Sequence, residues 1–211
     1  MILISRRETM RKQSFTLFLL SFCLLLLMGC ATLETKKKPY EVTPKGTVVY
    51  RGEFEFILPP LGWNIFWPEG EDEGEFAFGF MRRDPGPFPS QSIFAYDEEP
   101  FGCSTTFEGR EKEFFKRFLW NAILKFEVLE RKKVQVLGQE GLSVTVEGKD
   151  PVRKEKAKAK VIFTKRGERI VAFYITQWRP IDGVYDPSAF EVFDKFVQSF
   201  KYLKKSFYET L

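Results

Sequence analysis

An apolar run near the N-terminus divides this chain into a short leader and a longer segment that must supply the fold. The run Phe15–Met28 is almost wholly apolar and spans fourteen residues, whereas a helix that crosses a bilayer needs about twenty. It follows four basic residues: Arg6, Arg7, Arg11 and Lys12. A basic segment before a short apolar core is typical of a signal peptide. We therefore assign residues 1–29 to a signal peptide that starts at Met1 or Met10.

The end of the apolar run resembles the lipobox of bacterial lipoproteins. In Leu27-Met28-Gly29-Cys30, a leucine stands three residues before the cysteine and a glycine directly before it. The resemblance implies that the Cys30 thiol receives a diacylglycerol, that cleavage makes Cys30 the first residue, and that the new amino group is acylated in many bacteria. Two or more acyl chains form a stable membrane anchor. The alternative is an uncleaved apolar anchor with an incidental cysteine.

The residue after the cysteine bears on the compartment. In enteric-type lipoprotein sorting an aspartate at this place signals retention in the inner membrane, and this chain has Ala31. The resemblance therefore implies a cell-envelope lipoprotein on the outer membrane, facing the periplasm. The following segment is polar, with two prolines and no apolar periodicity, so it predicts a flexible tether over residues 30–46.

The charge balance gives no support for a nucleic-acid partner. The leader carries four of the 33 basic residues and one of the 29 acidic residues. Without the leader, the net charge falls to about +1. The sequence pI of 8.8 therefore does not indicate a basic face on the domain.

The cysteine and histidine counts exclude several chemistries. Cys23 lies in the leader and Cys30 is expected to be acylated, so the domain keeps Cys103 and has no partner for an internal disulfide. The chain has no histidine, which removes the usual general base and the usual metal ligand. The acidic stretch 69–75 lacks the alternating ligands of a calcium loop. We predict no catalytic residue, no metal and no cofactor.

The apolar patterns after residue 46 predict alternating groups of strands and helices. Short runs predict strands at 54–58, 62–67, 76–81 and 91–97. Apolar residues from Phe114 to Phe126 follow helical spacing, with Thr105 and Glu108 as a capping box. Two hairpins are expected, 127–137 with 142–146 and 156–165 with 169–178. A last helix is expected to begin near Asp186.

These elements predict one α+β domain over residues 47–205. Hairpins build an antiparallel sheet of about six to seven strands, and two main amphipathic helices pack on it. The domain resembles the PsbP-like family in an early Pro60-Leu61-Gly62-Trp63 phrase and a late Val197-Gln198-Ser199-Phe200 phrase. The resemblance implies helices on a central antiparallel sheet. It also implies an accessory or binding role without catalysis.

Aromatic residues supply the candidate binding surface. Most of the 24 phenylalanines fall on faces predicted to point inward. The exceptions lie on short proline-bounded segments: Trp63, Phe66, Trp67 and Phe88. Large aromatics on loops are typical of contact sites. We therefore expect a lipid-anchored binding or assembly module that meets an envelope protein, with a carrier of a lipid or other apolar ligand and an envelope enzyme as alternatives.

Overall fold

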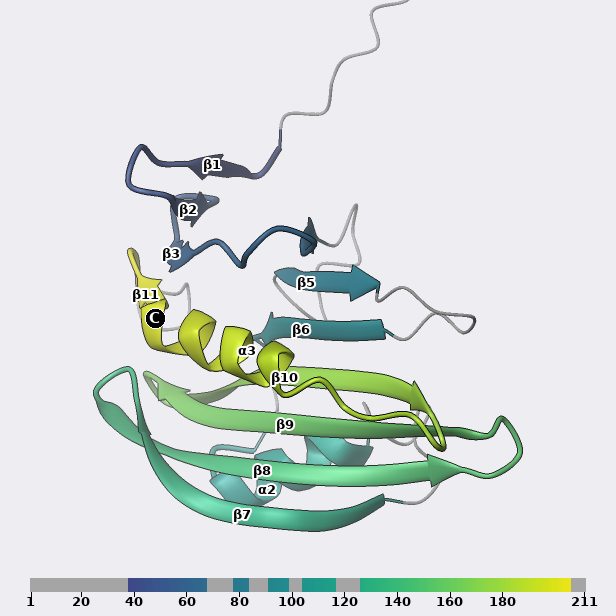
Figure 1. Cartoon of the computed structure of the whole chain (residues 1–211). Helices are drawn as coiled ribbons and strands as arrows, with labels where there is room; N and C mark the ends of the chain where they lie inside the picture. Colours follow the sequence, from purple (N-terminus) through teal and green to yellow (C-terminus); the bar gives the residue numbers. More distant parts are fainter. Residues whose placement is uncertain (1–37, 68–77, 84–90, 99–103, 117–125, 206–211) are drawn as a thin grey trace, which may run out of the picture. The chain divides into compact units, whose positions relative to one another are not determined.

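The computed structural model describes residues 38–67, 78–83, 91–98, 104–116 and 126–205. Within these ranges the chain forms two antiparallel sheets and two helices (Figure 1), which confirms the predicted α+β class. The leader and Cys30 lie outside the described residues. In the described part, no helix has both the length and the apolar character that crossing a membrane requires.

The larger sheet has seven strands in the order β4-β5-β6-β10-β9-β8-β7. Their bounds are β4 Asn64–Phe66, β5 Phe78–Arg83, β6 Gln91–Asp97, β10 Arg169–Pro180, β9 Glu155–Arg166, β8 Gln139–Asp150 and β7 Phe126–Val136. Both predicted hairpins are present as the pairs β7–β8 and β9–β10. Leu137 and Gly138 join the first pair with φ of 54° and 75°, the backbone of the two-residue turn that matches strand twist.

The smaller sheet has four strands in the order β1-β2-β3-β11. They are β1 Tyr40–Val42, β2 Thr47–Tyr50, β3 Phe54–Ile57 and β11 Lys201–Tyr202. Strand β1 lies within the range 30–46 that the sequence assigns to the tether. The Thr43 N–H donates to the Thr47 carbonyl at 2.8 Å, and the turn uses Gly46 at φ 77°. Residues 39–46 are therefore part of the folded unit, which the polar sequence alone does not reveal.

Side chains of the large sheet alternate between two covered faces. We call them the α3 face and the α2 face, after α3 (Pro187–Ser199) and α2 (Phe107–Phe114). Phe94 and Phe173 pack on the α3 face together with the small sheet, whereas Ala95 and Ala172 pack on the α2 face. In Figure 1, α3 lies in front of the long strands and α2 lies behind them. Each face thus has its own apolar core.

The helix starts follow from capping side chains. Helix α3 begins with Pro187 in its first turn, as predicted, and Asp186 caps it by accepting a hydrogen bond from the Ser188 N–H at 2.9 Å. Helix α2 is capped by Thr106 through the Gly109 N–H at 3.2 Å, one residue later than the predicted box at Thr105.

The predicted continuation of α2 toward Phe126 is wrong at its end. Phe126 begins strand β7, and residues 117–125 lie outside the described residues. Its ring still packs at 5.5 Å from the ring of Phe115. Apolar spacing therefore continues across the change from helix to strand, and the sequence pattern cannot mark that change.

A buried ion pair fixes α2 to the sheet. Arg110 Nη2 lies 3.1 Å from Asp97 Oδ2 at the end of β6, and the two side chains are 0% and 3% exposed. The Arg110 Nε–H also donates to the Ile170 carbonyl at 3.1 Å. Buried charges are tolerated when they are paired and hydrogen-bonded, so this contact orients α2 on its face.

Candidate functional site

The structure distributes the sequence-predicted aromatic residues over both faces of the sheet. Trp63 is half-buried against Phe94, with ring centroids 4.9 Å apart, and Trp67 meets Tyr40 edge-on at 5.6 Å. Both tryptophans pack against the α3-face core. Phe88 lies outside the described residues, as do Cys30, Cys103 and the acidic stretch 69–75.

Phe66 packs in the opposite direction. It pairs with Gly79 across β4 and β5, and a Cβ added to Gly79 would lie 2.5 Å from the Phe66 Cζ and 2.9 Å from the Ala95 Cβ. Ala95 belongs to the α2-face core. The structure therefore brings Trp63 and Trp67 to one face and Phe66 to the other, and all three rings take part in packing.

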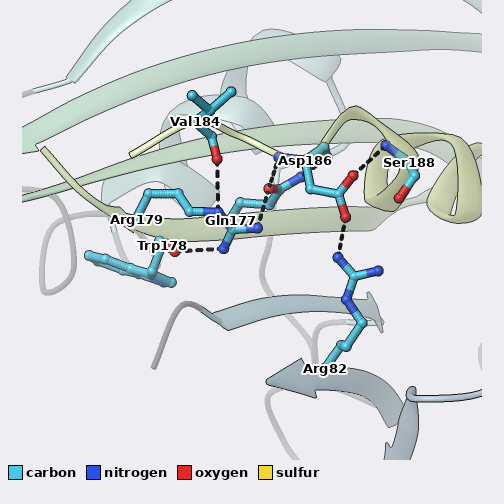
Figure 2. A network of polar contacts seen from close by, with 7 residues as sticks. All are labelled: Arg82, Gln177, Trp178, Arg179, Val184, Asp186 and Ser188. Atoms are coloured by element: carbon cyan, nitrogen blue, oxygen red, sulfur yellow. Dashed lines mark hydrogen bonds and ion pairs between the residues drawn. The ribbon is translucent and has the colours of Figure 1, made fainter. Parts of the chain in front are cut away.

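A polar network positions the start of α3 (Figure 2). The Gln177 side chain on β10 makes two hydrogen bonds to the backbone of Asp186: its Nε2 donates to the carbonyl at 2.6 Å and its Oε1 accepts from the N–H at 2.9 Å. Arg179 Nη2 donates to the same Oε1 at 2.9 Å. Arg82 Nη2 pairs with the Asp186 carboxylate. These contacts fix the first turn of α3 relative to β10 and β5.

A second polar cluster joins the large sheet to the small one. The Arg166 guanidinium carbon lies 4.4 Å from the ring centroid of Tyr202 and 5.2 Å from that of Phe54, and it pairs with Glu98. Burial is the main cause that raises the pKa of the Tyr96 hydroxyl well above its ordinary value. The neighbouring Tyr202 and Glu98 raise it further. Tyr96 therefore stays neutral and acts as a hydrogen-bonding core residue, which suits a structural joint.

A cleft opens on the α3 face near the β7 edge of the large sheet. It has a volume of about 290 Å³. Six side chains line it: Leu129, Glu130, Thr145, Lys158, Lys160 and Phe190. Glu130, Thr145 and Lys160 are direct neighbours across β7, β8 and β9, so they form one row along the floor. Phe190 projects from α3 and supplies the facing wall.

Three lysines of β9 share this face. Lys156, Lys158 and Lys160 alternate with Ala157 and Ala159, whose side chains are buried on the α2 face. Because strand side chains alternate between faces, the sequence Lys-Ala-Lys-Ala-Lys places the three ammonium groups on one side. Sequence reasoning missed this set, although the alternation was a readable signal.

The lysines differ in their partners. Lys160 Nζ lies 2.5 Å from Asp194 Oδ1 on α3. Lys158 Nζ lies 5.8 Å from the ring centroid of Tyr185 and 5.9 Å from that of Phe190. Lys156 Nζ lies 5.1 Å from the Tyr185 ring. In the described part of the chain, neither Lys156 nor Lys158 has a carboxylate within ion-pair distance, so their charge is held by aromatic rings.

One carboxylate, that of Glu147, lies close to both Tyr185 and Lys158. Glu147 stands opposite Lys158 across β8 and β9. Burial raises the pKa of Tyr185, and the adjacent Glu147 carboxylate raises it further. Lys158 lines the cleft, and the Glu147 carboxylate lies near both Lys158 and the Tyr185 hydroxyl.

The chemistry of this site suits binding. Its groups can hold a ligand by charge, by hydrogen bond and by apolar contact with Phe190 and Leu129. Among the residues that the structure describes, no group of three or more metal-ligating side chains comes together. The fold and the cleft together define an α+β domain with a small cleft on its surface.

Comparison with known proteins gives likeness of fold only. No protein-family model matches the sequence, and no curated protein matches it. Among solved structures, the chain is similar to LpqN of Mycobacterium tuberculosis, described as involved in cell envelope biogenesis, with TM-score 0.43 and 9% identity over 71% of this chain and 82% of that one.

Two further structures show a comparable likeness. The cyanobacterial PsbP of Synechocystis sp. has TM-score 0.43 and 17% identity, over 80% of this chain and 95% of that one. The Ran-binding protein Mog1p of Saccharomyces cerevisiae has TM-score 0.46 and 14% identity, over 74% of this chain and 93% of that one. A member of the PsbP group that the sequence resembles is therefore among the similar structures. At these scores and identities the likenesses carry no argument about activity or partners.

Proposed function

We propose that this chain is a lipid-anchored protein of the bacterial cell envelope whose domain binds a ligand or partner without catalysing a reaction. The lipobox-like Leu27–Cys30 supports the anchor. The observation that supports binding is the cleft on the α3 face, which combines an ammonium group without a carboxylate partner in the described residues with two apolar walls. Outer-membrane placement, facing the periplasm, rests on Ala31 after Cys30.

The anchor and the first strand together limit where the domain works. Nine residues separate Cys30 from Tyr40, the first residue of β1. If these residues act as the tether that the sequence predicts, Tyr40 lies at most about 36 Å from Cys30, because an extended chain spans about 3.3–3.6 Å per residue. A coil of the same length averages about 15–18 Å. The domain would then operate close to the membrane surface.

The packing of the interior favours a surface site over an internal one. The carrier alternative places an apolar ligand among the many phenylalanines. In the structure these rings contact each other: Phe56 and Phe78 stack at 4.7 Å, and Phe173 and Phe200 meet at 4.9 Å. Because neighbouring rings fill this space, the aromatic content is accounted for by the core. We therefore place the proposed binding function at the cleft.

The anchor is tested by labelling cells with radioactive palmitate. The wild-type chain should carry label and fractionate with membranes, because the acyl chains on Cys30 hold it there. Cys30→Ala should lose the label and leave the membrane fraction, whereas Cys103→Ala, the matched control, should behave as the wild type. A Cys30→Ala protein that still incorporates palmitate would overturn the lipobox interpretation.

A further inference from the structure

We propose that the cleft on the α3 face binds an anionic amphiphile, with the acidic head group on Lys158 and the first part of the hydrocarbon chain between Phe190 and Leu129. This inference rests on the proposed envelope location for the supply of such a ligand. Its physical basis is independent of that location, because it comes from the charges and surfaces that line the cleft.

The charge that faces the cleft is positive and local. Lys160 is paired with Asp194 at 2.5 Å, and Glu130 is paired with Lys132 at 3.1 Å. Lys158 has two aromatic rings near its ammonium group and, among the described residues, no carboxylate within ion-pair distance. An anion that enters the cleft therefore meets one ammonium group that is not already neutralised. Among the described residues that line the cleft, the carboxylate is Glu130, which is already paired, so a cationic ligand finds no equivalent partner there.

A second ammonium group strengthens this preference. Lys156 is two residues along the same strand and the same face, and its Nζ lies over the Tyr185 ring at 5.1 Å. Both lysines thus lie against one ring. Since two like charges side by side repel each other, a bound anion between or beside them gains attraction from both. A carboxylate or a phosphate monoester has the compact charge that suits this pair.

The apolar part of the proposed ligand follows from the walls. The Phe190 ring is half-buried and lies 5.9 Å from Lys158 Nζ. Leu129 sits at the bulge of β7 between Val128 and Glu130 and is 46% exposed. An anion on Lys158 is therefore beside apolar surface, and a short hydrocarbon chain attached to it can cover that surface. A volume of about 290 Å³ lies at the small end of ligand sites, so it suits a head group and a short length of chain.

Lysine footprinting on the full chain in phosphatidylcholine vesicles tests the proposal. The chain is acetylated with an amine-reactive ester, and the acetylation of each lysine is measured by mass spectrometry. The probe is hexyl phosphate in the aqueous phase. Inorganic phosphate tests the charge alone, hexyltrimethylammonium tests the chain alone, and vesicles that contain phosphatidylglycerol test a bilayer lipid as the source. Lys165, exposed on the same strand and outside the cleft lining, is the internal control.

The expected result is selective protection of Lys158. At a concentration ten times Kd about nine sites in ten are occupied, so hexyl phosphate should lower the acetylation of Lys158 about tenfold and leave Lys165 unchanged. Hexyltrimethylammonium should give no protection, and inorganic phosphate should need a much higher concentration. Protection by phosphatidylglycerol without free probe would identify a bilayer lipid as the source, and protection by hexyl phosphate alone would identify a dissolved amphiphile.

Substitutions at the floor of the cleft separate binding from nonspecific effects. Thr145→Leu should fill the floor and abolish the protection of Lys158, whereas Thr145→Ser should keep it. Equal protection by inorganic phosphate and hexyl phosphate, or no protection of Lys158 relative to Lys165, would refute the proposal. Neither readout depends on acylation of Cys30, so failure here is distinguishable from failure of the palmitate experiment.

Discussion

The buried ion pair between α2 and the large sheet makes a quantitative prediction. Asp97→Ala removes the carboxylate that lies 3.1 Å from Arg110 Nη2 and leaves that cation in a site where the Arg110 side chain is 0% exposed. Breaking one partner of a buried pair costs about 3–5 kcal/mol, because the remaining buried charge loses the carboxylate that pairs with it. The bond from the Arg110 Nε–H to the Ile170 carbonyl persists, so we expect the lower part of this range.

Urea unfolding followed by circular dichroism measures this loss. A domain of this size is typically stable by about 5–15 kcal/mol, so the variant should still fold and its transition midpoint should fall sharply. Replacing both partners by apolar residues, Asp97→Leu with Arg110→Met, should restore much of the stability, because neither charge of this buried pair remains. This double variant separates the cost of an unpaired charge from the loss of packing.

An exposed ion pair supplies the control. Lys133 and Glu140 lie 3.0 Å apart on the β7–β8 hairpin, with side chains 84% and 56% exposed, and Glu140→Ala should change the free energy of unfolding by less than about 1 kcal/mol. If Asp97→Ala were as mild as Glu140→Ala, the Arg110 charge would have to be compensated by other groups. The assignment of this pair as the fixing contact of α2 would then be wrong.

Two further predictions concern close packing and pH. Gly79→Ala should cost about 1–3 kcal/mol, because a Cβ there lies 2.5 Å from the Phe66 ring, and a Phe66→Leu background should reduce this cost in the same urea assay. Burial alone would raise the pKa of Asp186, but hydrogen bonds from Ser188 and Arg82 lower it below its ordinary value. A lowered native pKa stabilises the fold above the ordinary value of about 3.9, and this contribution is lost as pH falls through the native pKa. The Tm difference between wild type and Asp186→Ala should therefore be largest near neutral pH and shrink in acid; a constant difference would contradict this.

Much of the fold could be predicted where the signal is local. The β9–β10 turn, with Gly167 at φ 61°, the alternation of the long strands and the Asp186-Pro187-Ser188 helix start are all specified by neighbouring residues. The β7–β8 turn lies at Leu137-Gly138, so the expected start of the second strand at Leu142 is three residues late. Predictions failed where different structures share one local pattern. Apolar spacing runs through Phe126 into β7 because its ring packs on Phe115, and β1 looks like a linker because its three residues become a strand only by pairing with β2.

The candidate site was less accessible to sequence reasoning. The aromatic residues chosen for exposure, such as Trp63 and Trp67, are half-buried against the core. The alternating lysines of β9 could have been read as one face, but not their partners. Asp194, which neutralises Lys160, and Phe190, which lies beside Lys158, come from α3 more than 30 residues later. The position of α3 therefore decides which lysine forms an ion pair with a carboxylate of the described residues and which does not.

The sequence by itself determined the α+β class, the order of the main elements and the prediction of an acylated Cys30, because these depend on periodicity, turn residues and a short contiguous motif. Only the tertiary structure decided the second sheet, in which the two-residue β11 exists through its pairing with β3. It also decided the cleft, where β7, β8, β9 and α3 each contribute side chains. Such features require contacts between residues far apart in the chain, and no local pattern specifies which distant surfaces meet.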